Sequence, residues 1–173
     1  SATALEKIER WVKPQPANAF WKAGSKEAYR RLDRFVELRI EGYQEQRDFP
    51  ALDGTSQLSP YLAVGALSPR ACIHAALSAN HFEWDSGNPG IQTWINELIW
   101  REFYKHLIFN FPELCKGRAF QPATEFVRWQ RNPELLDAWK NGTTGFPIVD
   151  AAMRQLSTLG WMHNRLRMVT AMF

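Results

Sequence analysis

Apolar residues recur along this chain every three to four positions, which is the spacing of α-helices, and no long stretch alternates as a β-strand does. Between residues 25 and 46 one apolar stripe recurs at intervals of four, four and three residues: Leu32, Val36, Ile40 and Tyr43. This spacing predicts a single amphipathic helix of about six turns, with Ser25 as its N-cap. No internal repeat interrupts the helical pattern, so the sequence predicts an all-α fold, a multi-helix bundle-like domain.

Three further helices are predicted to begin where a capping side chain precedes a proline, at Ser59-Pro60, Ser68-Pro69 and Asn132-Pro133. Gly65 and Gly142 are predicted helix ends. Residues 147–173 predict two helices that are separated near Gly160. The last five residues are apolar and carry no stop signal, so we expect the chain to be cut within a helix.

A helix predicted over residues 93–109 has two distinct faces. One face is apolar, and the other combines a carboxylate, an indole, a guanidinium and a phenol: Glu97, Trp100, Arg101 and Tyr104. These groups offer an acceptor, a stacking surface and a phosphate-binding fork. The pattern alone favours such a binding face and an aromatic core stripe with an Arg-Glu pair on its rim about equally.

Apolar residues make up 45% and charged residues 23% of the 173 positions, as in an ordinary soluble globular domain. The net charge of +3 is too small to identify a polyanionic partner. Cys72 and Cys115 lie far apart and indicate neither a disulfide framework nor a zinc site. No apolar run approaches the roughly 18 residues that cross a bilayer, and no signal peptide is evident, so we expect no membrane contact and a cytoplasmic protein.

The common hydrolase, nucleotide-binding and zinc-protease motifs are absent, and the histidines have no metal-ligand spacing, so no metal site is expected. The segment 54–60 places small hydroxyls before a helix, where a phosphate could bind, although from the residues alone a capped loop is favoured. Residues 160–168 combine two arginines with an amide, which suits phosphate and base contacts, while a solvated surface is slightly favoured. Trp129 by itself indicates only a half-buried anchor.

Five stretches, in this order, resemble the flavin-binding half of the photolyase and cryptochrome family. They are GTSQLSP at 54–60, LSPR at 67–70, NELIWREFY at 96–104, GFPIVDAAMRQL at 145–156 and GWMHNR at 160–165. The resemblance runs from about Ala19 to the end, and several independent motifs in one order are far more specific than any of them alone. It implies a helical domain that binds FAD and UV-damaged DNA, in which reduced FAD donates an electron after absorbing light and splits a flipped-out cyclobutane pyrimidine dimer.

By this resemblance the expected FAD-binding residues are Tyr43, Thr55, Ser56, Gln57, Leu58, Ser59, Arg101, Asn164 and Arg167. The expected DNA-binding residues are Arg47, Glu97, Trp100, Arg101, Tyr104, Asn164 and Met168. Glu97 and Trp100 would line the dimer pocket, and Trp129 would be the outermost member of a tryptophan chain that reduces the flavin.

Trp100 and the WMHNR stretch are more similar to the bacterial branch that repairs pyrimidine dimers than to cryptochromes or to the branch that repairs (6-4) photoproducts. We therefore expect residues 1–18 to be a linker segment and residues 19–173 to be part of the helical domain. The family's α/β antenna domain, a further flavin-binding acid and the two inner tryptophans would be missing, so this chain would be impaired in FAD binding and flavin reduction. A signalling cryptochrome and an inert helical interaction module stay open as alternatives, and the resemblance names neither an antenna chromophore nor an oligomeric state.

Overall fold

The computed structural model describes residues 20–173, and all regular structure in that range is helical, which confirms the all-α prediction. The α-helices are α2 Ser25–Leu38, α3 Tyr43–Gln46, α4 Ser59–Ala63, α5 Pro69–Ala79, α6 Pro89–Asn110, α7 Pro133–Asn141, α8 Pro147–Leu159 and α9 Asn164–Met172. Two short 3₁₀ helices, η1 Pro112–Lys116 and η2 Pro122–Phe126, lie between α6 and α7. The predicted N-terminal segment 1–18 lies outside the described residues.

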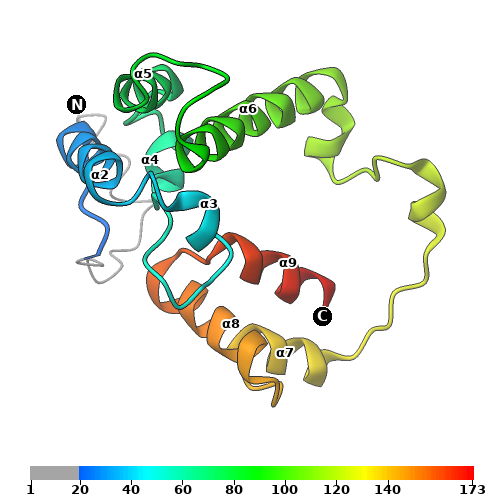
Figure 1. Ribbon diagram of the computed structural model, residues 1–173. Helices are drawn as coiled ribbons and strands as arrows, with labels where there is room; N and C mark the ends of the chain where they lie inside the picture. Colours follow the sequence, from blue (N-terminus) through cyan, green and yellow to red (C-terminus); the bar gives the residue numbers. More distant parts are fainter. Residues whose placement is uncertain (1–19) are drawn as a thin grey trace, which may run out of the picture.

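Helices α2 to α6 form the first of two helical clusters, which we call the N-terminal cluster (Figure 1). Its core is centred on Phe35 of α2, which is fully buried. The Phe35 ring lies 5.0 Å from that of Trp94 on α6 and 5.9 Å from that of Tyr43 on α3, measured between ring centroids. Burial of these rings fixes α6 against α2 and α3.

A buried asparagine, Asn80, connects the end of α5 to the loop that leads into α6. The buried Asn80 side chain donates to the backbone oxygens of Glu83 and Ser86, at 2.7 and 2.8 Å, and accepts from the backbone N–H of Asn88 at 2.9 Å. Asn88 in turn caps α6 by accepting from the N–H groups of its first turn. The start of α6 is therefore held by side-chain hydrogen bonds as well as by packing.

Helices α7 to α9 form the C-terminal cluster, which has a separate apolar core. Val149 and Met153 of α8 pack there with Met162 and with Leu166 of α9. The Trp139 indole N–H of α7 donates to the backbone oxygen of Thr170 on α9 at 3.0 Å, which closes the cluster.

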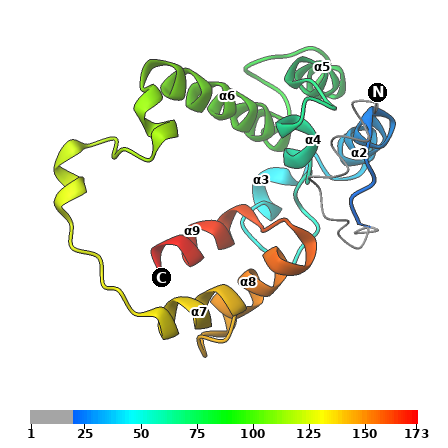
Figure 2. The ribbon, with the colours of Figure 1, turned by 180° about the vertical axis from the view of Figure 1, so that it is seen from behind.

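Residues 111–132 connect the two clusters as an extended arm, as both ribbon views show (Figures 1 and 2). None of these residues is buried. The helix pairs that pack most extensively all belong to one cluster or the other. Side-chain contacts within the described range also cross between the clusters. The Trp21 indole N–H donates to the backbone oxygen of Leu159 at 2.6 Å, and Arg165 pairs with Asp48 at 2.7 Å.

The single helix predicted over residues 25–46 is wrong, because the chain turns at residues 39–42 and forms α2 and α3 instead. The reason lies in α6, whose Gly90 comes so close to the backbone oxygens of Ile40 and Glu41 that no side chain would fit between them. The turn lets α6 approach while Ile40 and Tyr43 both remain buried. Periodicity within 25–46 carries no information about that neighbour.

Two predicted caps are also wrong. Ser25 is the first residue of α2 rather than its N-cap, a position taken by Gly24 at φ +100°, where glycine is favoured. Ser59 is the first residue of α4, and Leu58 precedes it with no capping side-chain hydrogen bond. The Ser68 and Asn132 caps are confirmed, as are the helix ends at Gly142 and Gly160, which adopt left-handed conformations. The turn at Gly65, at φ +74°, follows α4 as predicted.

Candidate functional site

Charged side chains from α3, α6 and α9 meet between the two clusters. The guanidinium of Arg47, at the end of α3, pairs with the Glu97 carboxylate of α6 through a 2.7 Å contact. Its neighbour Asp48 accepts from the Arg165 Nε of α9 at 2.7 Å and lies 3.5 Å from the Arg47 Nε. Two carboxylates and two guanidiniums thus alternate across three helices.

Tyr43 lies beneath this network and is 8% exposed. Burial raises the pKa of Tyr43 to about 12, because a phenolate would lose its hydration there. The Arg47 guanidinium lies 5.4 Å from the centroid of the Tyr43 ring, within the range of a cation–π contact. Tyr43 therefore remains a neutral phenol at physiological pH.

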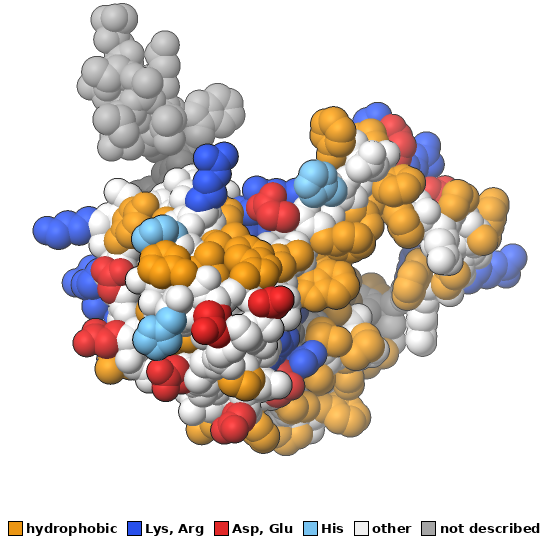
Figure 3. Space-filling model, turned by 45° about the horizontal axis from the view of Figure 1, so that its top comes forward, with side chains coloured by type: hydrophobic (Ala, Val, Ile, Leu, Met, Phe, Trp, Pro, Cys, Tyr) orange, Lys and Arg blue, Asp and Glu red, His pale blue; other side chains and the backbone are white. Residues whose placement is uncertain are grey.

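The solvent-facing side of α6 carries an aromatic group next to Glu97. Trp100 and Tyr104 are 53% and 58% exposed, their ring centroids are 6.1 Å apart, and Phe103 packs edge-on against Trp100. The space-filling view shows further hydrophobic side chains on the arm that follows α6 (Figure 3). An exposed indole beside a carboxylate can stack on a flat ring while the carboxylate accepts hydrogen bonds from it.

Arg101 points away from this aromatic group. Its guanidinium donates to the Glu102 carboxylate at 2.8 Å and to the backbone oxygen of Leu62 on α4 at 3.1 Å. The alternative of an aromatic core stripe with an Arg-Glu pair on its rim is wrong, because Trp100 and Tyr104 are exposed and Glu97 pairs with Arg47 instead of Arg101. The bond from Arg101 to Leu62 joins α6 to α4. Arg101 therefore contacts α4 at Leu62 and does not contribute to the aromatic group.

The loop before α4 carries Thr55, Ser56 and Gln57, which are half-buried, while Leu58 is buried in the core and Ser59 is exposed. The hydroxyls of Thr55 and Ser56 have no hydrogen-bond partner within residues 20–173. Gln57 adopts φ +53°, an uncommon conformation for a residue other than glycine, and donates to Asp53. Free hydroxyls on a tightly turned loop are available to bind an anion.

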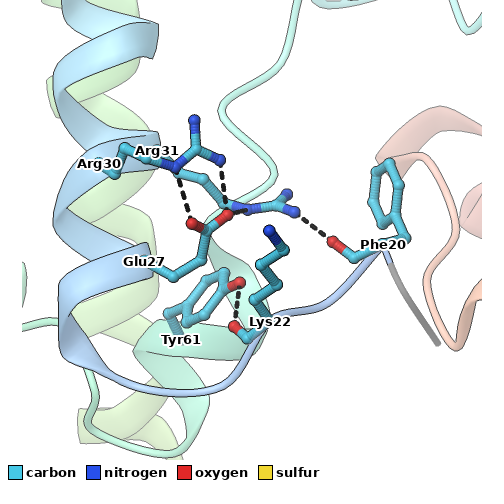
Figure 4. Close-up of polar contacts among 6 residues, drawn as sticks. All are labelled: Phe20, Lys22, Glu27, Arg30, Arg31 and Tyr61. Atoms are coloured by element: carbon cyan, nitrogen blue, oxygen red, sulfur yellow. Dashed lines mark hydrogen bonds and ion pairs between the residues drawn. The ribbon is translucent and has the colours of Figure 1, made fainter. Parts of the chain in front are cut away.

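Thr55, Ser56 and Gln57 also line a cavity of about 400 Å³. Four arginines from or next to α2 line the same cavity: Arg30, Arg31, Arg34 and Arg39. Most of these cations are paired. Arg30 and Arg31 share the Glu27 carboxylate (Figure 4), which lowers the pKa of Glu27 to about 2, and Arg39 pairs with Asp53 at 2.5 Å. The cavity is positively charged, although two carboxylates offset part of that charge.

Arg31 has a structural role in this wall. Its guanidinium stacks on the rings of Phe20, Trp21 and Tyr61, and it donates to the backbone oxygen of Phe20 (Figure 4). The Tyr61 hydroxyl of α4 donates to the backbone oxygen of Lys22 at 2.8 Å. These contacts attach the chain before α2 to both α2 and α4.

At the start of α9, Asn164 and Met168 are exposed next to Arg165, and the Arg165 Nη1 lies 3.7 Å from the Met168 sulfur. Arg167 donates from its Nε to the backbone oxygen of Met162 at 3.1 Å. The buried His163 is the N-cap, since its Nδ1 accepts from the backbone N–H of Arg165 at 3.2 Å. Burial lowers the pKa of His163, so the neutral ring is favoured.

The structure thus brings Tyr43, Arg47 and Glu97 together, and the Asp48–Arg165 pair links them to α9. Trp129 stands apart on the arm, and its 81% exposure corrects the expectation of a half-buried anchor. Asp48 and His163 were not identified from the sequence as parts of the site, and Arg165 was considered only as one of the two arginines of residues 160–168. The signals that could have identified them are the acid directly after Arg47 and the histidine directly before a predicted helix.

No helix in the described range is both long and apolar enough to cross a bilayer. Across residues 20–173 there is also no group of three or more His, Cys, Asp or Glu side chains placed to hold a metal ion.

Comparison with known proteins connects this geometry to a family. Residues 94–173 match the family model described as the FAD binding domain of DNA photolyase. The chain is 53% identical over 155 residues to the deoxyribodipyrimidine photo-lyase of Escherichia coli, covering 90% of this chain and 32% of that protein. It is 41% identical over 175 residues to the enzyme of the same name from Agrobacterium fabrum, covering 97% of this chain and 36% of that protein.

Solved structures agree with these sequence matches. A bacterial class III photolyase from Agrobacterium tumefaciens superposes with a TM-score of 0.84 at 39% identity, covering 96% of this chain and 35% of that one. A cryptochrome from Synechocystis sp. superposes with a TM-score of 0.79 at 29% identity, covering 91% and 34%. The chain spans about a third of the length of the curated relatives it matches. This chain belongs to the DNA photolyase and cryptochrome family, within its helical FAD-binding domain.

Proposed function

We propose that this chain supplies FAD-binding and DNA-binding residues of a deoxyribodipyrimidine photo-lyase, which repairs cyclobutane pyrimidine dimers in DNA with light. The observation that carries the proposal is the contact of Arg47 with Glu97, one helical turn before the exposed Trp100 on α6. The relatives named photo-lyase, at 53% and 41% identity, support dimer repair over cryptochrome signalling. A bacterial source and a cytoplasmic location are part of the same proposal.

The hydrogen-bond donors and the positive charge near α4 fit the diphosphate group of FAD. The loop before α4 offers the hydroxyls of Thr55 and Ser56 to a diphosphate, and the Arg101 guanidinium places a positive charge next to α4. Tyr43, Gln57, Leu58, Ser59, Asn164 and Arg167 complete the proposed cofactor set. Reduced FAD, when bound, supplies the electron that opens the cyclobutane ring after light is absorbed.

Trp100 and Glu97 are the proposed walls of the dimer pocket. An exposed indole can stack on a flipped-out pyrimidine for about 1–3 kcal/mol per base, and a carboxylate can accept hydrogen bonds from its N–H groups. Arg47 holds the Glu97 carboxylate by their 2.7 Å contact, so the acceptor is oriented before DNA arrives. The proposed DNA contacts further include Arg101, Tyr104, Asn164 and Met168.

Trp129 is the proposed outer member of an electron-transfer chain that reduces the flavin. Its 81% exposure suits that role, because the outermost indole must exchange electrons with reductants in solution.

The test is a titration of the chain with FAD, followed by flavin fluorescence. Replacing Thr55 and Ser56 together with alanine should weaken FAD binding, while Ser78→Ala, which removes an exposed hydroxyl on α5, should not. Equal FAD binding by the two variants would exclude the loop as the phosphate site.

A second titration tests the dimer pocket, with single-stranded DNA that contains one pyrimidine dimer. Trp100→Ala should weaken binding by roughly ten- to a hundredfold, the equivalent of one stacked base. Trp84→Ala is the matched control, because Trp84 is similarly exposed, at 51%, in the loop between α5 and α6. An equal effect of the two substitutions would contradict the assignment of Trp100.

A further inference from the structure

The proposed DNA site is divided between two bodies that pack separately. Glu97 and Trp100 lie on α6 in the N-terminal cluster, whereas Asn164 and Met168 lie on α9 in the C-terminal cluster. The covalent connection between the clusters is the exposed arm of residues 111–132, in which no residue is buried against either cluster. Something other than the chain connection must set the spacing across the site.

Besides the bond from Trp21 to Leu159, the Asp48–Arg165 pair joins the two clusters, and it lies next to Glu97 and Asn164. The Asp48 Oδ1 accepts from the Arg165 Nε at 2.7 Å and so joins the turn after α3 to the first turn of α9. The same carboxylate lies 3.5 Å from Arg47, which holds Glu97 at 2.7 Å. One carboxylate therefore connects residues on both sides of the site through guanidiniums.

This network restricts the orientation of the Arg165 side chain more than it adds to the free energy of unfolding. The Asp48 and Arg165 side chains are 49% and 39% exposed, and ion pairs at that exposure are individually weak. A guanidinium bound through its Nε is nevertheless restricted in direction, and the Arg165 Nη1 is also in contact with the Met168 sulfur. Fixing Arg165 therefore also restricts Met168 one turn further along α9.

We propose that Asp48 is a positioning residue, which holds α9 against the turn after α3 and thereby sets the spacing of Glu97 and Trp100 from Asn164 and Met168. Asp48 acts through Arg47 and Arg165 and is not itself a contact to the dimer. This inference rests on the proposed function, because the spacing matters for DNA that contacts both helices.

The alternative is that Asp48 is only a surface charge, and the two roles predict opposite results. Removing a negative charge beside DNA strengthens attraction to phosphates regardless of damage. Removing a positioning group lowers binding of the lesion relative to undamaged DNA, because the two walls of the pocket are no longer held in place. The ratio of the two affinities therefore separates the roles.

The experiment compares the wild-type chain, Asp48→Asn and Asp33→Asn in the presence of FAD. Asp33 is the control, since it is an exposed acid of α2 with no partner among the described residues. Binding of dimer-containing and undamaged oligonucleotides is measured at two salt concentrations. We expect Asp48→Asn to lower the preference for dimer-containing DNA on the order of tenfold and Asp33→Asn to leave it unchanged. An unchanged preference in Asp48→Asn overturns the proposal.

A second measurement keeps the test valid if the wild-type chain shows no preference for damaged DNA, a result that would contradict the proposed function instead. Spin labels at Ser78→Cys and Asp137→Cys, in a Cys115→Ser background, report the distance between the clusters without any ligand. We expect one narrow distance distribution with Asp48 present and a broader one in Asp48→Asn. Identical distributions would overturn the positioning role independently of DNA binding.

Discussion

Replacing Gly90 with alanine should destabilise this protein, although alanine is the better helix former. Gly90 is the second residue of α6, where its N–H is capped by the Asn88 side chain at 2.8 Å. A Cβ atom at this position would lie 2.1 Å from the backbone oxygen of Glu41 and 2.5 Å from that of Ile40. Both obstacles are backbone atoms, which cannot rotate away as the end of a flexible side chain can.

The size of the effect follows from these distances. Cβ atoms essentially never approach another heavy atom within 3.0 Å, so α6 and the turn at residues 40–41 must separate by about 0.9 Å. Overpacking of this kind costs about 1–3 kcal/mol, against at most about 1 kcal/mol gained from helix propensity. We expect Gly90→Ala to lower the free energy of unfolding by about 1–2 kcal/mol. The same movement should lengthen the 2.7 Å contact between Arg47 and Glu97.

Urea unfolding followed by far-UV circular dichroism measures this difference. Asn96→Ala is the matched control, since Asn96 lies on the exposed side of α6, and the substitution should be neutral or stabilising by about 0.5 kcal/mol. A Gly90→Ala variant as stable as the wild type would show that the close approach of α6 to the turn does not occur in solution, and the explanation given for the break between α2 and α3 would fail with it.

Three further predictions concern buried polar groups. His163→Ala should lower the free energy of unfolding by about 0.5–2 kcal/mol through loss of the α9 cap, and His163→Asn, which retains a capping acceptor, should lose measurably less in urea. Asn80→Ala removes three hydrogen bonds and should cost about 2–4 kcal/mol in the same assay, while Asn80→Asp should be no better because it places an oxygen opposite two backbone oxygens. Burial raises the pKa of Tyr43 to about 12, so the unfolded chain releases the phenolic proton first, near pH 10. The contribution of the buried neutral Tyr43 to the free energy of unfolding is therefore complete below pH 10 and is lost as the pH rises toward 12. Between pH 10 and 11 the wild type should lose about 1 kcal/mol relative to Tyr43→Phe in urea titrations, and an equal loss in both proteins would contradict the burial of this hydroxyl.

Local signals in the sequence predicted those parts of the fold that depend on neighbouring residues. Ser68 and Asn132 cap helices because each is followed by proline and needs only its own chain to form the cap. Gly160 ends α8 because a left-handed residue is required there, and the helical period of residues 93–109 was sufficient to predict most of α6. The caps predicted at Ser59, which also precedes a proline, and at Ser25, which does not, are wrong, because neither side chain accepts a hydrogen bond from its helix.

The site was predicted in part for a similar reason. Glu97 and Trp100 share a helix face, so their relation to one another is contained in a spacing of three residues. The contact of Glu97 with Arg47, fifty residues earlier, depends on how α3 packs against α6, and the local pattern did not indicate it. Arg101 is the counterexample, since it lies on the same helix but reaches α4 rather than the aromatic group.

The sequence by itself determined the helical class, most helix boundaries and the family, because these follow from periodicity, capping chemistry and motifs in a fixed order. Only the tertiary structure decided where the chain turns between α2 and α3, how the two clusters meet, and that Asp48 and Arg165 join them. The physical reason is distance along the chain. A cap or a helix stripe is formed by residues within about four positions of one another, whereas Asp48 and Arg165 are 117 positions apart and meet only after both helical clusters have packed.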